Sequence, residues 1–139
     1  MAPRAGRTAR CDREAALTRV RQARAFIEVA ELCLPEADDP EMPLRGVVGA
    51  LAVLAGIAAS DAACCTRLGQ RSRGQDHSQA VALVRTVRPE GEQLARDLER
   101  LLTIKDNAQY GTIAISLQQA RAAAQQARRM VATVEAMLQ

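Results

Sequence analysis

Apolar residues recur at helical spacing through the first and last thirds of this chain. Over 13–34 they return every three or four positions, at Ala16, Val20, Ala23, Ile27, Ala30 and Leu34. Over 116–139 the same spacing links Ala120, Ala123, Ala127, Val131, Val134 and Leu138. Such spacing places the apolar residues on one stripe of a helix. Each segment therefore predicts a long amphipathic helix with one buried face.

The segment 44–69 predicts a different kind of helix, because it is apolar on nearly every side as far as Ala59. Its many glycines and alanines let neighbouring helices approach closely, at some cost in helix propensity. This helix suits the centre of a bundle or the seam of a homodimer. Asp61 interrupts the apolar run and must face water, a partner arginine or a functional site. Three prolines and four carboxylates in 35–43 predict an exposed acidic loop before it.

A third helix is predicted over 76–88, with Asp76 and Gln79 forming a capping box. Its buried face holds Ala80, Leu83, Val84 and Val87. Pro89 splits this stretch, and a second apolar stripe continues at Leu94, Leu98, Leu101 and Leu102. Residues 105–111 predict a helix end with a turn, and Ser116 with Gln119 predicts a capping box for the last helix.

These elements predict an all-α protein. Alanine, leucine, arginine and glutamine favour helix, and no window alternates β-branched with polar residues. Four long helical stretches, the third split near Pro89, indicate an up-and-down four-helix bundle. A chain of 139 residues suits one domain, and we assign 13–139 to the bundle and 1–12 to a disordered basic tail.

Positive charge gathers at the N-terminal end. Residues 1–24 hold seven arginines against Asp12 and Glu14, a balance of +5, while the whole chain carries +3. Such an end attracts nucleic acid or an acidic partner, or it is simply a frayed, soluble terminus. Phe26 and Tyr110 are the only aromatic residues, which argues against a base-stacking platform for single strands.

The four cysteines, Cys11, Cys33, Cys64 and Cys65, do not follow a zinc-ligand pattern, so no metal is expected. Cys64 and Cys65 fit an apolar core, disulfides are not expected, and the predicted compartment is therefore the reducing cytoplasm. The longest apolar run, 46–59, is too short to cross a bilayer, and we expect no membrane association.

The stretch from Arg71 to His77 holds the only histidine of the chain. If Asp76 caps the third helix, His77 lies at the positive end of the helix dipole, which disfavours the imidazolium and leaves a neutral base. Free amides of the first turn form an anion site, to which Asp76, Ser72 and Arg73 contribute. Arg71 or Arg73 would stabilise charge on a phosphoryl group while His77 moves a proton.

Two further residues have supporting roles in this hypothesis. Asp61 is expected to pair with Arg67, Arg71 or another basic group, and secondarily to orient His77. Tyr110 is expected to pack, with a role in the site as the second interpretation. The alternative is that this stretch has no function beyond starting a helix with polar and charged residues.

These residues resemble a known superfamily. The sequence around Arg71 and His77 resembles the Arg-(four to six residues)-His signature of the HEPN (higher eukaryotes and prokaryotes nucleotide-binding) domain superfamily, as a small bacterial stand-alone member. Ala108-Gln-Tyr-Gly111 resembles the Ala-x-Tyr-Gly stretch common in HEPN proteins. The resemblance implies a homodimeric helical bundle, with Arg71 as the phosphate-stabilising residue and His77 as base or acid.

The same resemblance implies a set of functions. Many HEPN proteins are RNases of toxin–antitoxin, abortive-infection or CRISPR systems, and others bind nucleotides or partners without catalysis. We therefore expect a metal-independent endoribonuclease without cofactors, and the resemblance implies a cognate antitoxin or a nucleotidyltransferase-like protein as its partner. The alternatives are a non-catalytic nucleotide-binding module and a structural helical dimer that serves a protein partner. Gln79 stands where some toxin members have a modified tyrosine, which argues against that mode of regulation.

Overall fold

The computed structural model describes residues 7–74, 76–110 and 114–139, without the side chains of 107–110. This part of the chain is mostly helical, as predicted. Its helices are α1 (Arg13–Cys33), α2 (Leu44–Leu68), α3 (His77–Arg85), α4 (Gly91–Tyr110) and α5 (Leu117–Met137), with a 3₁₀ turn at Leu34–Glu36. Two short strands, β1 (Thr8–Arg10) and β2 (Gln70–Ser72), form a small antiparallel ribbon.

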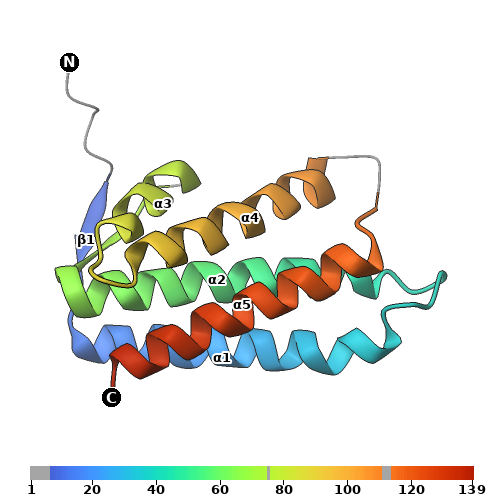
Figure 1. Ribbon diagram of the computed structural model, residues 1–139, viewed down its shortest axis with the longest axis horizontal. Helices are drawn as coiled ribbons and strands as arrows, with labels where there is room; N and C mark the ends of the chain where they lie inside the picture. Colours follow the sequence, from blue (N-terminus) through green and yellow to red (C-terminus); the bar gives the residue numbers. More distant parts are fainter. Residues whose placement is uncertain (1–6, 75, 111–113) are drawn as a thin grey trace.

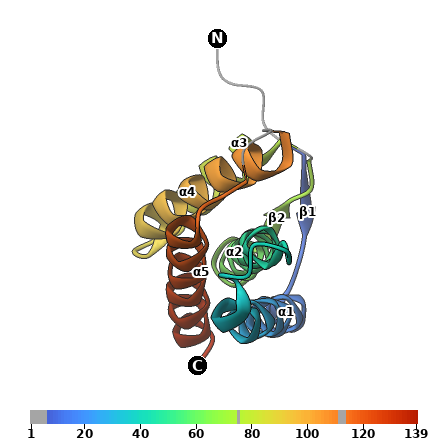
Figure 2. The same cartoon turned by 90° about the vertical axis from the view of Figure 1, so that its right-hand side faces the viewer.

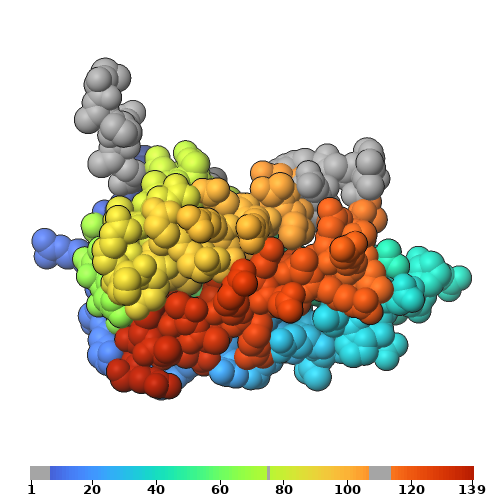
Figure 3. All heavy atoms as spheres, in the orientation of Figure 1, coloured from blue at the N-terminus to red at the C-terminus, as the bar shows by residue number. Residues whose placement is uncertain are grey.

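The long helices pack in alternating directions along the chain. Helices α1, α2 and α5 lie side by side, and α4 crosses obliquely above them with the short α3 at one end (Figure 1). Seen end-on, the β-ribbon lies beside α2, on the side away from α5 (Figure 2). Helices α4 and α5 together cover one face of the molecule (Figure 3). The two strands, the end of α2 and the start of α1 therefore meet at one end of the fold.

The predicted stripes form the core. Ala16, Ala23, Ile27 and Ala30 of α1 are fully buried, as are Ala120, Ala127, Val131 and Val134 of α5. Helix α2 is long and apolar enough to cross a membrane, but most of its apolar stretch is buried inside the fold, as in the core helix of a soluble protein. Helix α2 thus lies at the centre of the other helices, which is one of the two positions predicted for it, the other being the seam of a homodimer.

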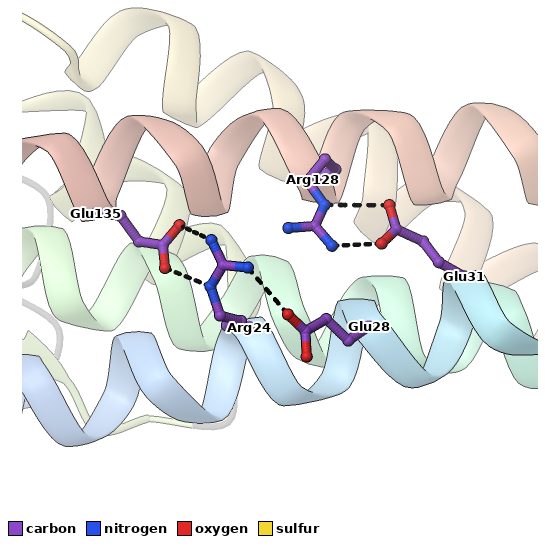
Figure 4. A network of polar contacts seen from close by, with 5 residues as sticks. All are labelled: Arg24, Glu28, Glu31, Arg128 and Glu135. Atoms are coloured by element: carbon purple, nitrogen blue, oxygen red, sulfur yellow. Dashed lines mark hydrogen bonds and ion pairs between the residues drawn. The ribbon is translucent and has the colours of Figure 1, made fainter.

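Ion pairs fix how α1 lies against α5. Arg24 donates two hydrogen bonds of 2.6 Å to Glu135 and one of 2.9 Å to Glu28, and Arg128 pairs with Glu31 (Figure 4). These side chains are largely exposed, so each pair contributes at most about 1 kcal/mol. They set the register of the two helices more than the stability of the fold.

The disordered tail predicted over 1–12 is wrong for its last residues. Thr8 pairs with Ser72, Ala9 with Arg71 and Arg10 with Gln70. Asp12 is the N-cap of α1, where its carboxylate accepts a 2.9 Å hydrogen bond from Ala15 N–H. A strand whose partner lies some sixty residues later leaves no local pattern, so sequence periodicity could not reveal it.

The absence of disulfides is also a wrong prediction. Cys11 and Cys65 form a disulfide between the residue after β1 and the end of α2, with Cα atoms 5.2 Å apart. The expectation of a reducing cytoplasm rested on free thiols and loses that support. Cys64 is a buried free thiol, as predicted, and burial raises its pKa to about 12.

The break near Pro89 is confirmed, since α3 ends at Arg85 and α4 begins at Gly91. The helix end predicted over 105–111 is also present, since α4 ends at Tyr110, and the turn predicted after it lies outside the described residues. The predicted capping box of Ser116 and Gln119 is present at the start of α5.

Gly56 of α2 makes the closest helix contact in the core. A Cβ there would lie 2.5 Å from Leu101 Cδ1 and 3.4 Å from the Met130 sulfur, whereas a Cβ at Gly46 meets nothing within 4 Å. We expect Gly56→Ala to lower the free energy of unfolding by about 1–3 kcal/mol through overpacking. The control Gly46→Ala should raise it by up to about 1 kcal/mol through helix propensity. Urea unfolding measures both, and equal effects would contradict this packing.

Candidate functional site

His77 occupies the first turn of α3, as predicted. Asp76 is the N-cap, and its carboxylate accepts hydrogen bonds from Ser78 N–H at 2.9 Å and from the Ser78 hydroxyl at 2.6 Å. These bonds, the side-chain one first, hold the pKa of Asp76 below its usual range. The predicted capping box with Gln79 does not form, because Gln79 donates its backbone N–H to the Asp76 carbonyl while its side chain lies beside Gly74.

The imidazole of His77 meets a side chain that the sequence hypothesis did not include. Lys105 Nζ of α4 lies 2.9 Å from His77 Nε2. An ammonium group has only donors, so Nε2 must accept this hydrogen bond. With Lys105 as the donor, the ring proton of His77 lies on Nδ1. This partner is new.

Lys105 is the only lysine of the chain, among eighteen arginines. The single histidine thus pairs with the single lysine, 28 residues apart. A lone lysine in so arginine-rich a chain is a signal that sequence reasoning missed, since a compact ammonium and a planar guanidinium are not interchangeable.

A groove of about 630 Å³ runs between α3 and α4 beside this pair. Val81, Ala82 and Leu102 form its apolar part, and His77, Thr103 and Asp106 line its polar part. Arg85, which also lines the groove, is bound to Glu99 at 2.6 Å. The groove thus presents the His77 imidazole and two hydroxyl groups, together with the carboxylates of Asp76, Glu99 and Asp106. Lys105 reaches the imidazole from outside the groove, since it lines a separate hollow of about 460 Å³ between α2 and α4.

The structure does not bring Arg71 into this groove. Arg71 lines a second hollow, of about 640 Å³, with Asp12, Thr18, Arg19 and Gln22 of the α1 N-terminal region. Its direction follows from its place in β2, where it pairs with Ala9 of β1. The expected single constellation of Arg71 and His77 is therefore divided between two hollows, because the pairing of β2 with β1 directs Arg71 to the start of α1.

The neighbours of Arg71 occupy different environments. Ser72 is half-buried, and its hydroxyl has no hydrogen-bond partner within the described part of the chain. Arg73 is exposed, and its backbone N–H donates to the Arg7 carbonyl at 2.9 Å. Both residues belong to the β-ribbon or follow it directly, and neither lines the groove at His77.

Asp61 pairs with a basic group, as predicted, and that group is Arg19. Arg19 donates a 2.9 Å hydrogen bond to the Asp61 carboxylate, which is only 8% exposed. Burial raises the pKa of Asp61, and the charges of Arg19 and Arg71 oppose that rise. Arg67, the other partner considered, instead binds Glu90. Asp61 is therefore tied to Arg19 and lies within the influence of the Arg71 charge, while it does not line the groove at His77.

Tyr110 is the last residue of α4, and its side chain lies outside the described part of the structure. Within the residues that the structure describes, no group of three or more His, Cys, Asp and Glu side chains could hold a metal ion.

Comparison with protein-family models, curated proteins and solved structures gives no match. The HEPN resemblance therefore depends on the Arg71–His77 and 108–111 segments alone. The functional argument has to come from the groove itself.

Proposed function

We propose that the groove at His77, whose imidazole Lys105 contacts from the neighbouring hollow, is a phosphoryl site and that the protein is a HEPN-like, metal-independent endoribonuclease. The observation that carries the proposal is the 2.9 Å contact between His77 Nε2 and Lys105 Nζ. An imidazole that accepts a hydrogen bond at Nε2 can also take a proton there, and the neighbouring ammonium can neutralise a phosphate. The alternating long helices are compatible with the four-helix bundle that the resemblance implies.

A phosphate entering the groove would draw the Lys105 ammonium away from the imidazole and free Nε2. His77 would then take the proton of the ribose 2′-hydroxyl as its oxygen forms a bond to phosphorus. The bond from phosphorus to the 5′-oxygen breaks, and the leaving oxygen takes a proton from water or from the His77 of a second copy. Lys105 would stabilise the charge on the phosphoryl oxygens. The products would be a 2′,3′-cyclic phosphate and a free 5′-hydroxyl.

The division of Arg71 from His77 changes the roles within this proposal. Lys105 replaces Arg71 as the cation beside the histidine. Asp76 supports the first turn of α3, and Ser72, Arg73 and Arg71 lie on the ribbon side. In a non-catalytic nucleotide-binding module, the second candidate, the same groove would hold a phosphate without cleaving it.

The test is cleavage of single-stranded RNA by purified protein in EDTA. We expect His77→Ala to lower the cleavage rate at least about 100-fold, the lower end for loss of a general base. Lys105→Ala should lower it as well, while Arg100→Ala, which removes an exposed charge from the same helix, should leave it unchanged. Circular dichroism checks that each variant is folded.

Cleavage that survives His77→Ala would rule out the catalytic assignment. Saturable nucleotide binding that weakens in Lys105→Ala, without any cleavage by the wild type, would establish the nucleotide-binding alternative. If the protein neither binds nucleotides nor cleaves RNA, the structural dimer remains as the third alternative. Its interface would bury exposed apolar side chains of α1 and α2, namely Val29, Leu32, Val47 and Leu54.

A further inference from the structure

The β-ribbon gathers arginines on one of its faces. The register pairs Ala9 with Arg71, and the hydrogen bond from Arg73 N–H to the Arg7 carbonyl extends it by one pair. Successive side chains of a strand point to opposite faces. Arg7, Arg71 and Arg73 therefore share one face, with Ala9 as the fourth member. Arg10 lies on the opposite face, together with Thr8 and Ser72.

Arg7 and Arg73 stand directly opposite each other across the two strands. Cross-strand neighbours lie about 5 Å apart, and like charges in such a position destabilise the pairing. The ribbon is held against this repulsion at its other end. There Cys11 N–H donates to the Gly69 carbonyl at 3.0 Å, and the Cys11–Cys65 disulfide joins β1 to α2. An arrangement that is held in place despite its repulsion suggests that an anion belongs between the two guanidinium groups.

Acidic groups do not neutralise this face. Among the described residues, no ion pair within 4.0 Å involves Arg7, Arg71 or Arg73. Two carboxylates on this side of the fold already have partners. Asp61 is bound to Arg19, and Asp12, which lines the hollow beside Arg71, caps α1. Glu14 also lines that hollow, so the outer part of the face, at Arg7 and Arg73, carries the uncompensated charge.

We propose that this arginine face, made of Arg7, Arg71 and Arg73, binds the phosphate backbone of a single-stranded nucleic acid. Arg71 and Arg73 are two positions apart on a strand, which separates their side chains by about 7 Å and suits successive phosphates of an extended chain. The face contains no aromatic side chain on which a base could stack, so contact is with the backbone.

The arginine face also lies close to the His77 groove. Arg73 precedes His77 by four residues, so their Cα atoms are at most about 14 Å apart. A strand bound along the face can therefore reach the groove. The binding itself is independent of catalysis. Only the view that the bound strand is the substrate rests on the proposed endoribonuclease function.

The test measures binding of a labelled RNA of about 20 nucleotides by fluorescence anisotropy, across a salt titration, in the His77→Ala background so that no RNA is cut. Loss of two phosphate contacts lowers the salt slope by about 1.4 for a single strand. Arg7→Gln/Arg73→Gln should therefore weaken binding by about 25-fold at 0.1 M salt. Arg10→Gln removes one arginine charge from the opposite face of the same ribbon and should keep the slope of the parent.

A double variant that binds with the slope and affinity of Arg10→Gln would overturn the proposal. DNA of the same sequence should bind about as well as RNA, because the backbone is what is contacted. Vesicles with anionic lipid should bind more weakly, and equal binding that is lost in the same variant would identify a lipid surface instead. RNA binding by this face without cleavage by the wild type would refute only the endoribonuclease. Cleavage of RNA by the wild type, together with unaltered RNA binding in the double variant, would refute only the arginine face.

Discussion

Replacing Cys11 with serine is expected to lower the free energy of unfolding by about 4 kcal/mol. The Cys11–Cys65 disulfide closes a loop with a sequence separation of 54 residues. Closing a loop of that length restricts the unfolded chain by about 4 kcal/mol in the chain-entropy description. Urea unfolding of the oxidised protein, with wild type and variant side by side, measures the difference.

A reductant should bring the wild type close to the variant in the same experiment. Cys33→Ser is the matched control, because Cys33 is half-buried and free, and it should change the stability little. If reductant leaves the unfolding midpoint of the wild type unchanged, the two cysteines are not bonded in solution. The loosened ribbon should also expose the backbone amides of Thr8–Arg10 to hydrogen exchange.

Arg19→Ala is expected to cost about 3–5 kcal/mol at neutral pH. Removing one partner of a buried ion pair leaves an uncompensated charge in a poorly solvated position. That charge is the carboxylate of Asp61, which is 8% exposed. Of the two arginines that lower its pKa, only Arg71 would remain. The comparison is Arg24→Ala, which removes an exposed pair with Glu135 and should cost less than about 1 kcal/mol.

The effect should depend on pH in a defined direction. Burial raises the folded-state pKa of Asp61 above the unfolded value, so its contribution to stability is present at low pH and is lost as the pH rises through the folded pKa. Loss of Arg19 raises that pKa further. The destabilisation should therefore be largest at pH 7 and shrink towards pH 4, as Asp61 becomes neutral.

A second substitution separates charge from packing. Arg19→Ala/Asp61→Asn should recover most of the lost stability at pH 7, because no buried carboxylate remains. A double variant as unstable as Arg19→Ala alone would assign the loss to packing of the arginine side chain. Either result is read from urea unfolding at the two pH values.

Local sequence patterns were sufficient for most of the helical framework. The stripe from Ala16 to Ala30 and the stripe from Ala120 to Val134 are buried as predicted, because a period near 3.6 residues can face one core in only one way. Asp76 and Ser116 cap their helices for an equally local reason, since each satisfies backbone amides within three residues. These features need no knowledge of distant parts of the chain.

The site was only half predictable. The position of His77 in the first turn of α3 follows from its neighbour Asp76, which caps that helix. Its partner Lys105 comes from α4, and only the packing of α3 on α4 brings the two nitrogen atoms to 2.9 Å. The sequence signal was the rarity of lysine, which identifies an unusual residue without saying what it contacts.

By itself, the sequence determined which segments are helical, which faces they bury and where the chain gathers positive charge. The tertiary structure decided what those charges and thiols meet. Pairing of Thr8–Arg10 with Gln70–Ser72 turned a basic tail into an ordered arginine face, directed Arg71 away from His77 and brought Cys11 to Cys65. Helical periodicity is encoded within a few residues, whereas a strand pair and a disulfide join residues that are distant in the chain. Their contacts exist only once the helices have packed.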